Sequence, residues 1–131
     1  MHEHWYRLHL VTDRALSKGR PLVEVAREAV AGGASCVQLR EKVCGTREFL
    51  DEAVQLSELL KPLGVPLIIN DRIDVALAAC ADGIHLGQTD MPIRYARRIV
   101  PPGWIIGVSA ESLEDAIRAE AEGAEIGRAH V

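Results

Sequence analysis

The chain has 131 residues, 48% of them hydrophobic and only 4% aromatic, and its 15 basic and 19 acidic residues give a net charge of −4. This length fits a single domain with a buried core rather than a disordered segment. The sequence shows no basic run of the nucleic-acid-binding kind, no secretory leader and no apolar stretch of membrane-spanning length, and its three cysteines lack metal-ligand spacing. We therefore expect a cytoplasmic domain that binds neither nucleic acid nor membrane.

Short apolar segments alternate with amphipathic helical patterns along the chain. The apolar segments predict strands at residues 8–12, 36–40, 66–70, 83–86 and 104–109. Apolar side chains at helical spacing predict helices at 21–31, 46–60, 74–80 and 92–100. A last helix begins at Ser112 with a capping-box-like start, and its buried stripe is predicted to comprise Leu113, Ala116, Ile117 and Ala121. This alternation predicts an α/β fold with a parallel sheet.

Five such strand–helix units fill the chain, and no linker or low-complexity segment divides it. A closed barrel of eight units needs roughly 200 residues or more. The residues alone therefore leave two architectures open, an open five-stranded sheet and an incomplete barrel.

The second predicted strand runs directly into the polar stretch Gln38–Lys42. Strand alternation places Gln38 and Arg40 on one face of the sheet and Val37 and Leu39 on the other. An arginine fork and a lysine charge at the carboxyl end of a parallel strand suit an anion, and barrel enzymes place their chemistry at this end. This stretch therefore predicts an anion-binding site.

Two later strand ends carry carboxylates. Asn70 and Asp71 follow the third predicted strand, and Asp90 follows the fourth. Cations at one strand end and carboxylates at the others suggest a pyrophosphate held partly by protein and partly by Mg²⁺. Structural roles remain as alternatives: a turn for Asn70 and Asp71, the N-cap of the helix at 92–100 for Asp90, and a cap of the last helix for Ser109.

Four blocks of sequence together resemble the thiamine-phosphate synthase family. They are Gln38–Lys42, Ile69–Ala76, Asp82–Pro92 and Ile106–Ser109, and the resemblance extends over about residues 6–125. The fold of that family is a (β/α)8 TIM barrel. The resemblance therefore implies that residues 1–125 form the first five βα units of an incomplete TIM barrel.

The resemblance implies a transferase that joins hydroxymethylpyrimidine diphosphate to thiazole phosphate and releases thiamine phosphate and pyrophosphate. Its partners would be these small-molecule substrates, and a homo-oligomer is compatible with the resemblance. The later phosphate-binding loops of the family have no counterpart in this sequence, so we expect the chain to be inactive alone. A thiazole tautomerase of the same barrel family and a non-catalytic phosphate-binding fragment are the alternatives, and the presence of both Asp71 and Asp90 favours the synthase.

The resemblance also assigns roles to single residues. It implies that Arg40 and Lys42 are catalytic and that Asp71 and Asp90 bind Mg²⁺ as the cofactor. The substrate-binding residues that it implies are Gln38, Leu39, Arg40, Glu41, Lys42, Asn70 and Ser109. We expect the side chain of Glu41 to face the helix layer or solvent, which favours a structural role for it over substrate binding.

Residues 126–131 depart from the usual continuation of the family, Gly-Ala-Asp-Tyr-Ile-Gly-Val-Gly-Pro. Here Gly123-Ala124 is followed by Glu125 and then by Ile-Gly-Arg-Ala-His-Val, which has no strand pattern. The codons ATC-GGA-AGA-GCA-CAC-GTC encode this ending and resemble a common short-read sequencing adapter. We therefore expect residues 126–131 to be a non-native tail without a strand, with a natural polar C-terminus as the alternative.

Overall fold

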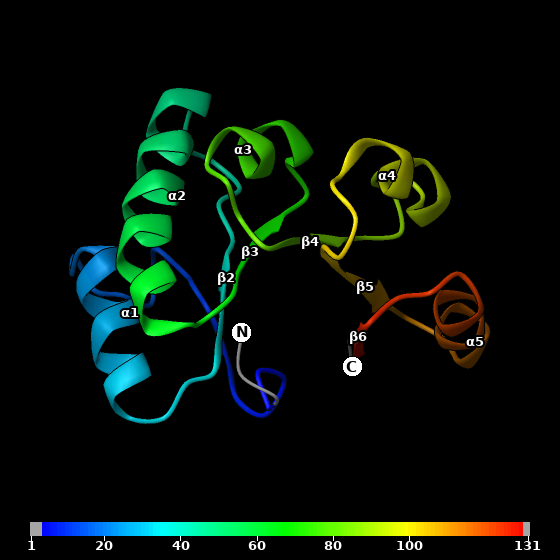
Figure 1. Cartoon of the computed structure of the whole chain (residues 1–131), viewed down its shortest axis with the longest axis horizontal. Coiled ribbons are helices and arrows are strands. Elements are labelled where there is room, and N and C mark those ends of the chain that lie inside the picture. Colours follow the sequence, from blue (N-terminus) through cyan, green and yellow to red (C-terminus); the bar gives the residue numbers. More distant parts are fainter. Residues whose placement is uncertain (1–3, 130–131) are drawn as a thin grey trace.

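The computed structural model describes residues 4–129 and shows a six-stranded parallel sheet whose strands follow chain order. The strands are β1 (His9–Val11), β2 (Cys36–Leu39), β3 (Leu67–Asn70), β4 (Gly83–Leu86), β5 (Ile105–Ala110) and β6 (Ile126–Ala129). The helices are α1 (Leu22–Ala31), α2 (Thr46–Leu60), α3 (Ile73–Ala78), α4 (Ile93–Ile99) and α5 (Leu113–Ala121), with a 3-10 turn η1 (Lys61–Leu63) after α2. The sheet curls and the helices cover its outer side, so the fold is a half-barrel (Figure 1).

The two faces of the sheet are packed very differently. On the outer face, strand side chains such as Val37, Leu39 and Ile69 are fully buried against the helices in one large core. On the inner face a small cluster joins Cys36, Ile68 and Ile105, with partly buried Trp5 and Ile126 beside it. Because successive strand residues point to opposite faces, each strand supplies both layers. The inner layer is the one that carries polar side chains toward the carboxyl ends of the strands.

A repeated polar contact fixes the opposite, amino-terminal edge of the sheet. Ser35, Asp82 and Glu125 each stand just before a strand and each follows an alanine. Their side-chain oxygens accept hydrogen bonds of 2.8–2.9 Å from the backbone N–H groups of Leu8, Leu67 and Ile106. The backbone N–H groups of the same three residues donate back to the carbonyls of Leu8, Leu67 and Ile106. These contacts fix the register of β1 with β2, β3 with β4, and β5 with β6.

The predicted α/β class and parallel sheet are confirmed, but the number of strands is wrong. Residues 126–129, expected to lack a strand, form β6 in parallel register with β5, where Ile126 pairs with Gly107. Their pattern carries little strand signal, but the open edge of β5 offers unpaired backbone groups and Glu125 anchors the incoming chain. Residues 130–131 of the predicted tail lie outside the described residues, and its non-native origin stays a prediction.

The apolar stripe of α5 is also not where the sequence placed it. Ser112 caps the helix as expected, because its Oγ accepts from the backbone N–H of Asp115 at 3.1 Å. However, Leu113 is 76% exposed and Ile117 59% exposed, and Ala119 is the buried residue of this helix. Amphipathic spacing predicts which face of a helix can be buried, but burial also requires an element that packs against that face. Among residues 4–129 no element covers the apolar face of α5.

None of the described helices is both long enough and apolar enough to cross a membrane.

Candidate functional site

The carboxyl ends of the strands border a hollow of about 230 Å³. We call it the strand-end hollow, and the predicted site residues that line it are Arg40, Lys42, Asn70, Asp90 and Ser109. They come from the ends of β2, β3, β4 and β5, which are 16 or more residues apart in sequence but adjacent in the sheet. Parallel strands place all their carboxyl ends at one edge, which explains why this edge gathers the polar residues.

Three of these side chains form a continuous hydrogen-bonded chain. Lys42 Nζ donates to Asn70 Oδ1 at 2.7 Å, and Asn70 Nδ2 donates to Gln38 Oε1 at 3.1 Å. Gln38 and Asn70 are buried, with 3% and 7% of their surface exposed, whereas Lys42 is exposed. The two amides therefore hold the lysine terminus at the mouth of the hollow, where an ammonium keeps two further donors for a ligand.

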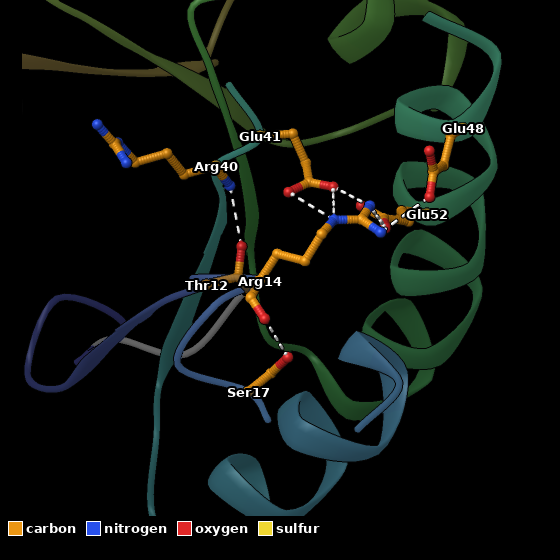
Figure 2. A network of polar contacts seen from close by, with 7 residues as sticks. All are labelled: Thr12, Arg14, Ser17, Arg40, Glu41, Glu48 and Glu52. Atoms are coloured by element: carbon orange, nitrogen blue, oxygen red, sulfur yellow. Dashed lines mark hydrogen bonds and ion pairs between the residues drawn. The ribbon is translucent and has the colours of Figure 1, made fainter. Parts of the chain in front are cut away.

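Arg40 supplies the second cation. Its backbone N–H donates to Thr12 Oγ1 at 3.0 Å, which fixes the main chain just beyond β2. Its side chain leaves the main chain on the side away from Glu41 (Figure 2). Among residues 4–129, no hydrogen bond or ion pair engages the Arg40 guanidinium. A half-buried guanidinium without a carboxylate partner is suited to an incoming anion.

Asp71 and Asp90 form a pair of interacting carboxylates beside this anion site. Burial raises the pKa of Asp71, and a hydrogen bond and charge repulsion from Asp90 add to the rise, against weaker opposing effects of Lys42 and Arg72. The main chain at Asp71 is left-handed, with φ of 66°, and its N–H donates to the carbonyl of His85 at 2.8 Å. This uncommon backbone conformation turns the residue immediately after β3.

The alternative role of Asp90 as a helix cap is wrong. Helix α4 begins at Ile93 with Pro92 at its N-cap and without a side-chain cap. Asp90 Oδ2 instead accepts from the backbone N–H of Gly87 at 2.7 Å, which closes the loop after β4 and brings the carboxylate back toward Asp71.

The donor set of this pair fits a hard divalent cation. Mg²⁺ takes oxygen ligands and is usually held by one or two carboxylates, with waters and substrate phosphate completing its shell. Within the described part of the chain, no group of three or more His, Cys, Asp or Glu side chains could hold a metal by itself. Asp71 and Asp90, whose interaction raises the pKa of Asp71, are therefore the strongest metal-binding candidate among the described residues.

Ser109 lies on the inner face of β5 and does not cap α5, whose cap is Ser112. Its Oγ lies 3.0 Å from Nε2 of His85, which is only 1% exposed. Gly107 makes room for that ring, because a Cβ there would lie 2.5 Å from His85 Nδ1. Ser109 therefore lines the hollow while its hydroxyl is paired with a buried histidine.

Three of the predicted substrate-binding residues do not line the hollow: Gln38, which is buried and bonds Asn70, and Leu39 and Glu41. Leu39 is fully buried in the helix-facing core. Glu41 turns toward α2 and meets Arg14, which confirms the expectation that it faces the helix layer (Figure 2). The predicted substrate binding by Leu39 and Glu41 therefore rests on their backbone groups alone.

The sequence analysis gave no site role to five residues that also line the hollow: Gly87, Gln88, Thr89, Glu111 and Arg128. Gln88 Nε2 donates to the carbonyl of Ser109 at 2.6 Å, and its place two residues before Asp90 was the available signal. Arg128 belongs to β6, which the sequence did not predict, so no signal pointed to it.

Comparison with known proteins agrees with this geometry. The family model described as thiamine monophosphate synthase matches residues 8–127, nearly the whole chain. The chain belongs to the thiamine monophosphate synthase family. The resemblance first noted in four sequence blocks is thereby confirmed.

Individual members of the thiamine monophosphate synthase family show how much of the fold is present. Thiamine-phosphate synthase of Albidiferax ferrireducens is 58% identical over 112 residues, which are 86% of this chain and 51% of the relative. The enzyme of that name from Methanocella arvoryzae is 50% identical over 120 residues, 92% of this chain and 57% of the relative. Thiamine phosphate pyrophosphorylase from Pyrococcus furiosus superposes with a TM-score of 0.88 at 42% identity, over 97% of this chain and 61% of that structure. The chain thus spans about half the length of the curated relatives it matches.

Proposed function

We propose that the protein acts as a thiamine-phosphate synthase, a transferase that joins hydroxymethylpyrimidine diphosphate to thiazole phosphate and releases thiamine phosphate and pyrophosphate. The observation that carries the proposal is the strand-end hollow, where unpaired cations lie beside two interacting carboxylates. Membership of the family supports the reaction class. The predicted cytoplasmic location and self-association stay predictions.

The protein has little covalent chemistry to perform in this reaction. The thiazole nitrogen attacks the methylene carbon of the pyrimidine substrate as the bond from that carbon to the diphosphate oxygen breaks. Negative charge grows on the leaving diphosphate, so Arg40 and Lys42 have the catalytic role of holding and neutralising it. Gln38 and Asn70 fix the lysine, and Ser109 contacts the pyrimidine substrate in the hollow.

We propose that Asp71 and Asp90 hold the Mg²⁺ cofactor. When bound, the ion supplies positive charge to the diphosphate and so assists its departure. The residues themselves prepare the site, because the bond from Gly87 to Asp90 and the left-handed turn at Asp71 hold both carboxylates together before any cation arrives.

The two alternative functions gain no support from the relatives reported above. A thiazole tautomerase has no diphosphate leaving group, so it does not account for two carboxylates beside two cations. A non-catalytic module would bind diphosphate without turnover, which a product assay separates from the synthase.

The test completes the barrel and then looks for product. Residues 1–125 are joined to the remaining carboxyl-terminal part of the Albidiferax ferrireducens relative, which is 58% identical over the matched region. Formation of thiamine phosphate and pyrophosphate is measured with both substrates and Mg²⁺. We expect turnover in the chimera and none without the thiazole substrate. A folded chimera that binds pyrophosphate but forms no product would contradict the proposal and favour the non-catalytic module.

A further inference from the structure

A second group of charged side chains lies on the helix side of residues 40–42. We call it the Arg14 cluster, and it comprises Arg14, Glu41, Glu48 and Glu52 (Figure 2). Arg14 Nε donates to Glu41 Oε2 at 3.0 Å, and its NH1 donates to Glu48 Oε1 at 2.8 Å. Its NH2 donates to both Glu41 and Glu52. One arginine from the loop after β1 therefore ties the segment after β2 to helix α2.

Burial within the Arg14 cluster is uneven, and this shows which contact matters most. The Glu41 side chain is only 3% exposed, whereas those of Arg14 and Glu48 are 42% and 55% exposed. Burial by itself would raise the pKa of Glu41, but hydrogen bonding above all from Arg14 outweighs it and leaves the pKa lowered. Glu41 is thus a buried, ionised carboxylate that depends on Arg14, because an unpaired charge in this place would be strongly disfavoured.

Glu41 stands between the two cations of the strand-end hollow. Arg40 and Glu41 leave the main chain in opposite directions, as neighbours in an extended segment do (Figure 2). The backbone of the same segment is tied to Thr12, whose Oγ1 accepts from Arg40 N at 3.0 Å and whose N–H donates to the carbonyl of Gln38 at 2.9 Å. Thr12 and Arg14 therefore hold the segment through its backbone and through its one buried side chain.

We propose that Arg14 is a positioning residue for the anion site: by holding Glu41 against α2, it keeps Arg40 and Lys42 turned toward the strand-end hollow. Arg14 does not line the hollow, so it acts through Glu41 and not by touching the anion. The inference rests on the proposed function in one respect, namely that the hollow binds a diphosphate group.

Loss of Arg14 has two consequences that both weaken anion binding. Glu41 would lose its cation while still facing the carboxylate of Glu52, so it would turn toward solvent. That movement rotates the segment that carries Arg40 and Lys42, and it also brings a carboxylate within reach of the two cations. Misplacement by about 1 Å can cost on the order of 100-fold in a positioned site, so a measurable effect is expected.

The experiment titrates the chain with inorganic pyrophosphate in the presence of Mg²⁺ by isothermal calorimetry. The test variant is Arg14→Gln, and Arg20→Gln is the matched control because Arg20 makes an exposed ion pair with Glu28 away from the hollow. We expect Arg14→Gln to weaken affinity at least about 10-fold and Arg20→Gln to change it by no more than about twofold. Arg14→Lys should recover part of the loss, because it restores the charge but not the fork.

A second measurement separates positioning from general destabilisation. Amide hydrogen exchange should become faster at residues 40–42 of Arg14→Gln while the amides of β3 keep their wild-type protection. Faster exchange throughout the sheet, with residues 40–42 no different from the rest, would mean that Arg14 is merely structural and would overturn the inference. If Arg14→Gln does not fold, the double variant Arg14→Gln/Glu41→Gln takes its place, because it removes both charges. This double variant should still bind pyrophosphate more weakly than the wild-type chain.

The outcomes distinguish the inference from the function on which it rests. If Arg14→Gln binds pyrophosphate as tightly as Arg20→Gln, the positioning role is wrong and the diphosphate site stands. If neither the wild-type chain nor Arg20→Gln binds pyrophosphate, the diphosphate site itself is wrong and the inference falls with it.

Discussion

The strand-end hollow and the Arg14 cluster lie on either side of residues 40–42, and their charged side chains are paired in different ways. In the Arg14 cluster one cation pairs with three carboxylates of the protein itself, and the excess negative charge contributes to the raised pKa of Glu52. At the hollow Arg40 has no carboxylate partner, and the neighbouring Asp71 interacts more strongly with Asp90 than with the cations Lys42 and Arg72. A cation that is already paired within the protein serves the fold, whereas a cation without a carboxylate partner at a strand end is suited to bind a ligand.

The comparison predicts its largest effect at Arg40. Arg40→Ala in the completed chimera should lower turnover at least about 100-fold, because charge on the leaving diphosphate loses a positioned cation. Steady-state assays with both substrates measure this, with Arg20→Gln as a control for surface arginines. Turnover within about threefold of the parent protein would remove Arg40 from the catalytic set.

The carboxylate pair should respond to both Mg²⁺ and pH. Because the folded-state pKa of Asp71 is raised, its ionised form is disfavoured in the folded protein, and protons compete with Mg²⁺ as pH falls through that pKa. Mg²⁺ at about ten times its dissociation constant should stabilise the chain by about 1.4 kcal/mol near neutral pH, and by less in acid.

Asp71→Asn is the matched variant, since asparagine also tolerates the left-handed backbone. It should be more stable than wild type without Mg²⁺, because the repulsion from Asp90 is gone, and it should lose the response to Mg²⁺. Thermal unfolding with and without the ion measures both effects. An Asp71→Asn variant that keeps the full Mg²⁺ response would place the cation elsewhere.

Glu52 should give the Arg14 cluster a pH dependence of its own. Burial first, and then Glu41, raise the pKa of Glu52 from 4.5 to about 7. Between pH 4.5 and pH 7 the unfolded chain has released the Glu52 proton that the folded chain retains. Ionisation of Glu52 therefore lowers the stability of the protein as pH rises, and the whole of this stability is lost above pH 7.

Glu52→Gln keeps an oxygen for Arg14 but cannot ionise. The variant should be more stable than wild type, and its gain in unfolding free energy should be larger at pH 8 than at pH 5 by about 1–2 kcal/mol. This value is reduced because the side chain is partly solvated. Denaturant unfolding at the two pH values measures it. An equal difference at both would show that Glu52 has an ordinary pKa.

The smallest effect is expected at Glu48, which is 55% exposed and contacts the same arginine. Glu48→Gln should change unfolding free energy by no more than about 0.5 kcal/mol, because exposed ion pairs contribute little. Denaturant unfolding at pH 7 measures the difference. A loss as large as that of Arg14→Gln would mean that the exposed contact, and not Glu41, anchors the arginine.

The parts that the sequence predicted correctly depend on local pattern. The first five strands lie within one residue of their predicted bounds, because buried parallel strands appear in the sequence as short apolar runs. The gathering of Arg40, Asn70 and Asp90 followed from topology alone, since parallel strands share one carboxyl edge.

The parts that the sequence did not predict depend on partners distant in the chain. In the Arg14 cluster, Arg14 contacts carboxylates 27 to 38 positions away in the sequence, and no sequence periodicity predicts such contacts. The stripe of α5 has the spacing of a buried face but lacks a covering element among residues 4–129, so Leu113 stays exposed. Strand β6 forms because the edge of β5 accepts it, which is a property of β5 rather than of Ile126–Ala129.

The central claim is that the strand-end hollow is the diphosphate site, and its most direct test is a ¹⁵N NMR titration of the chain with pyrophosphate and Mg²⁺. We expect the largest shifts at Arg40, Lys42 and Asn70, which line only the strand-end hollow, whereas Asp90 also lines a second cavity. This second cavity, of about 340 Å³ between α4 and α5, carries Arg94 and Arg118 and offers a competing place for an anion. Shifts confined to that cavity, or no shifts at all, would contradict the account.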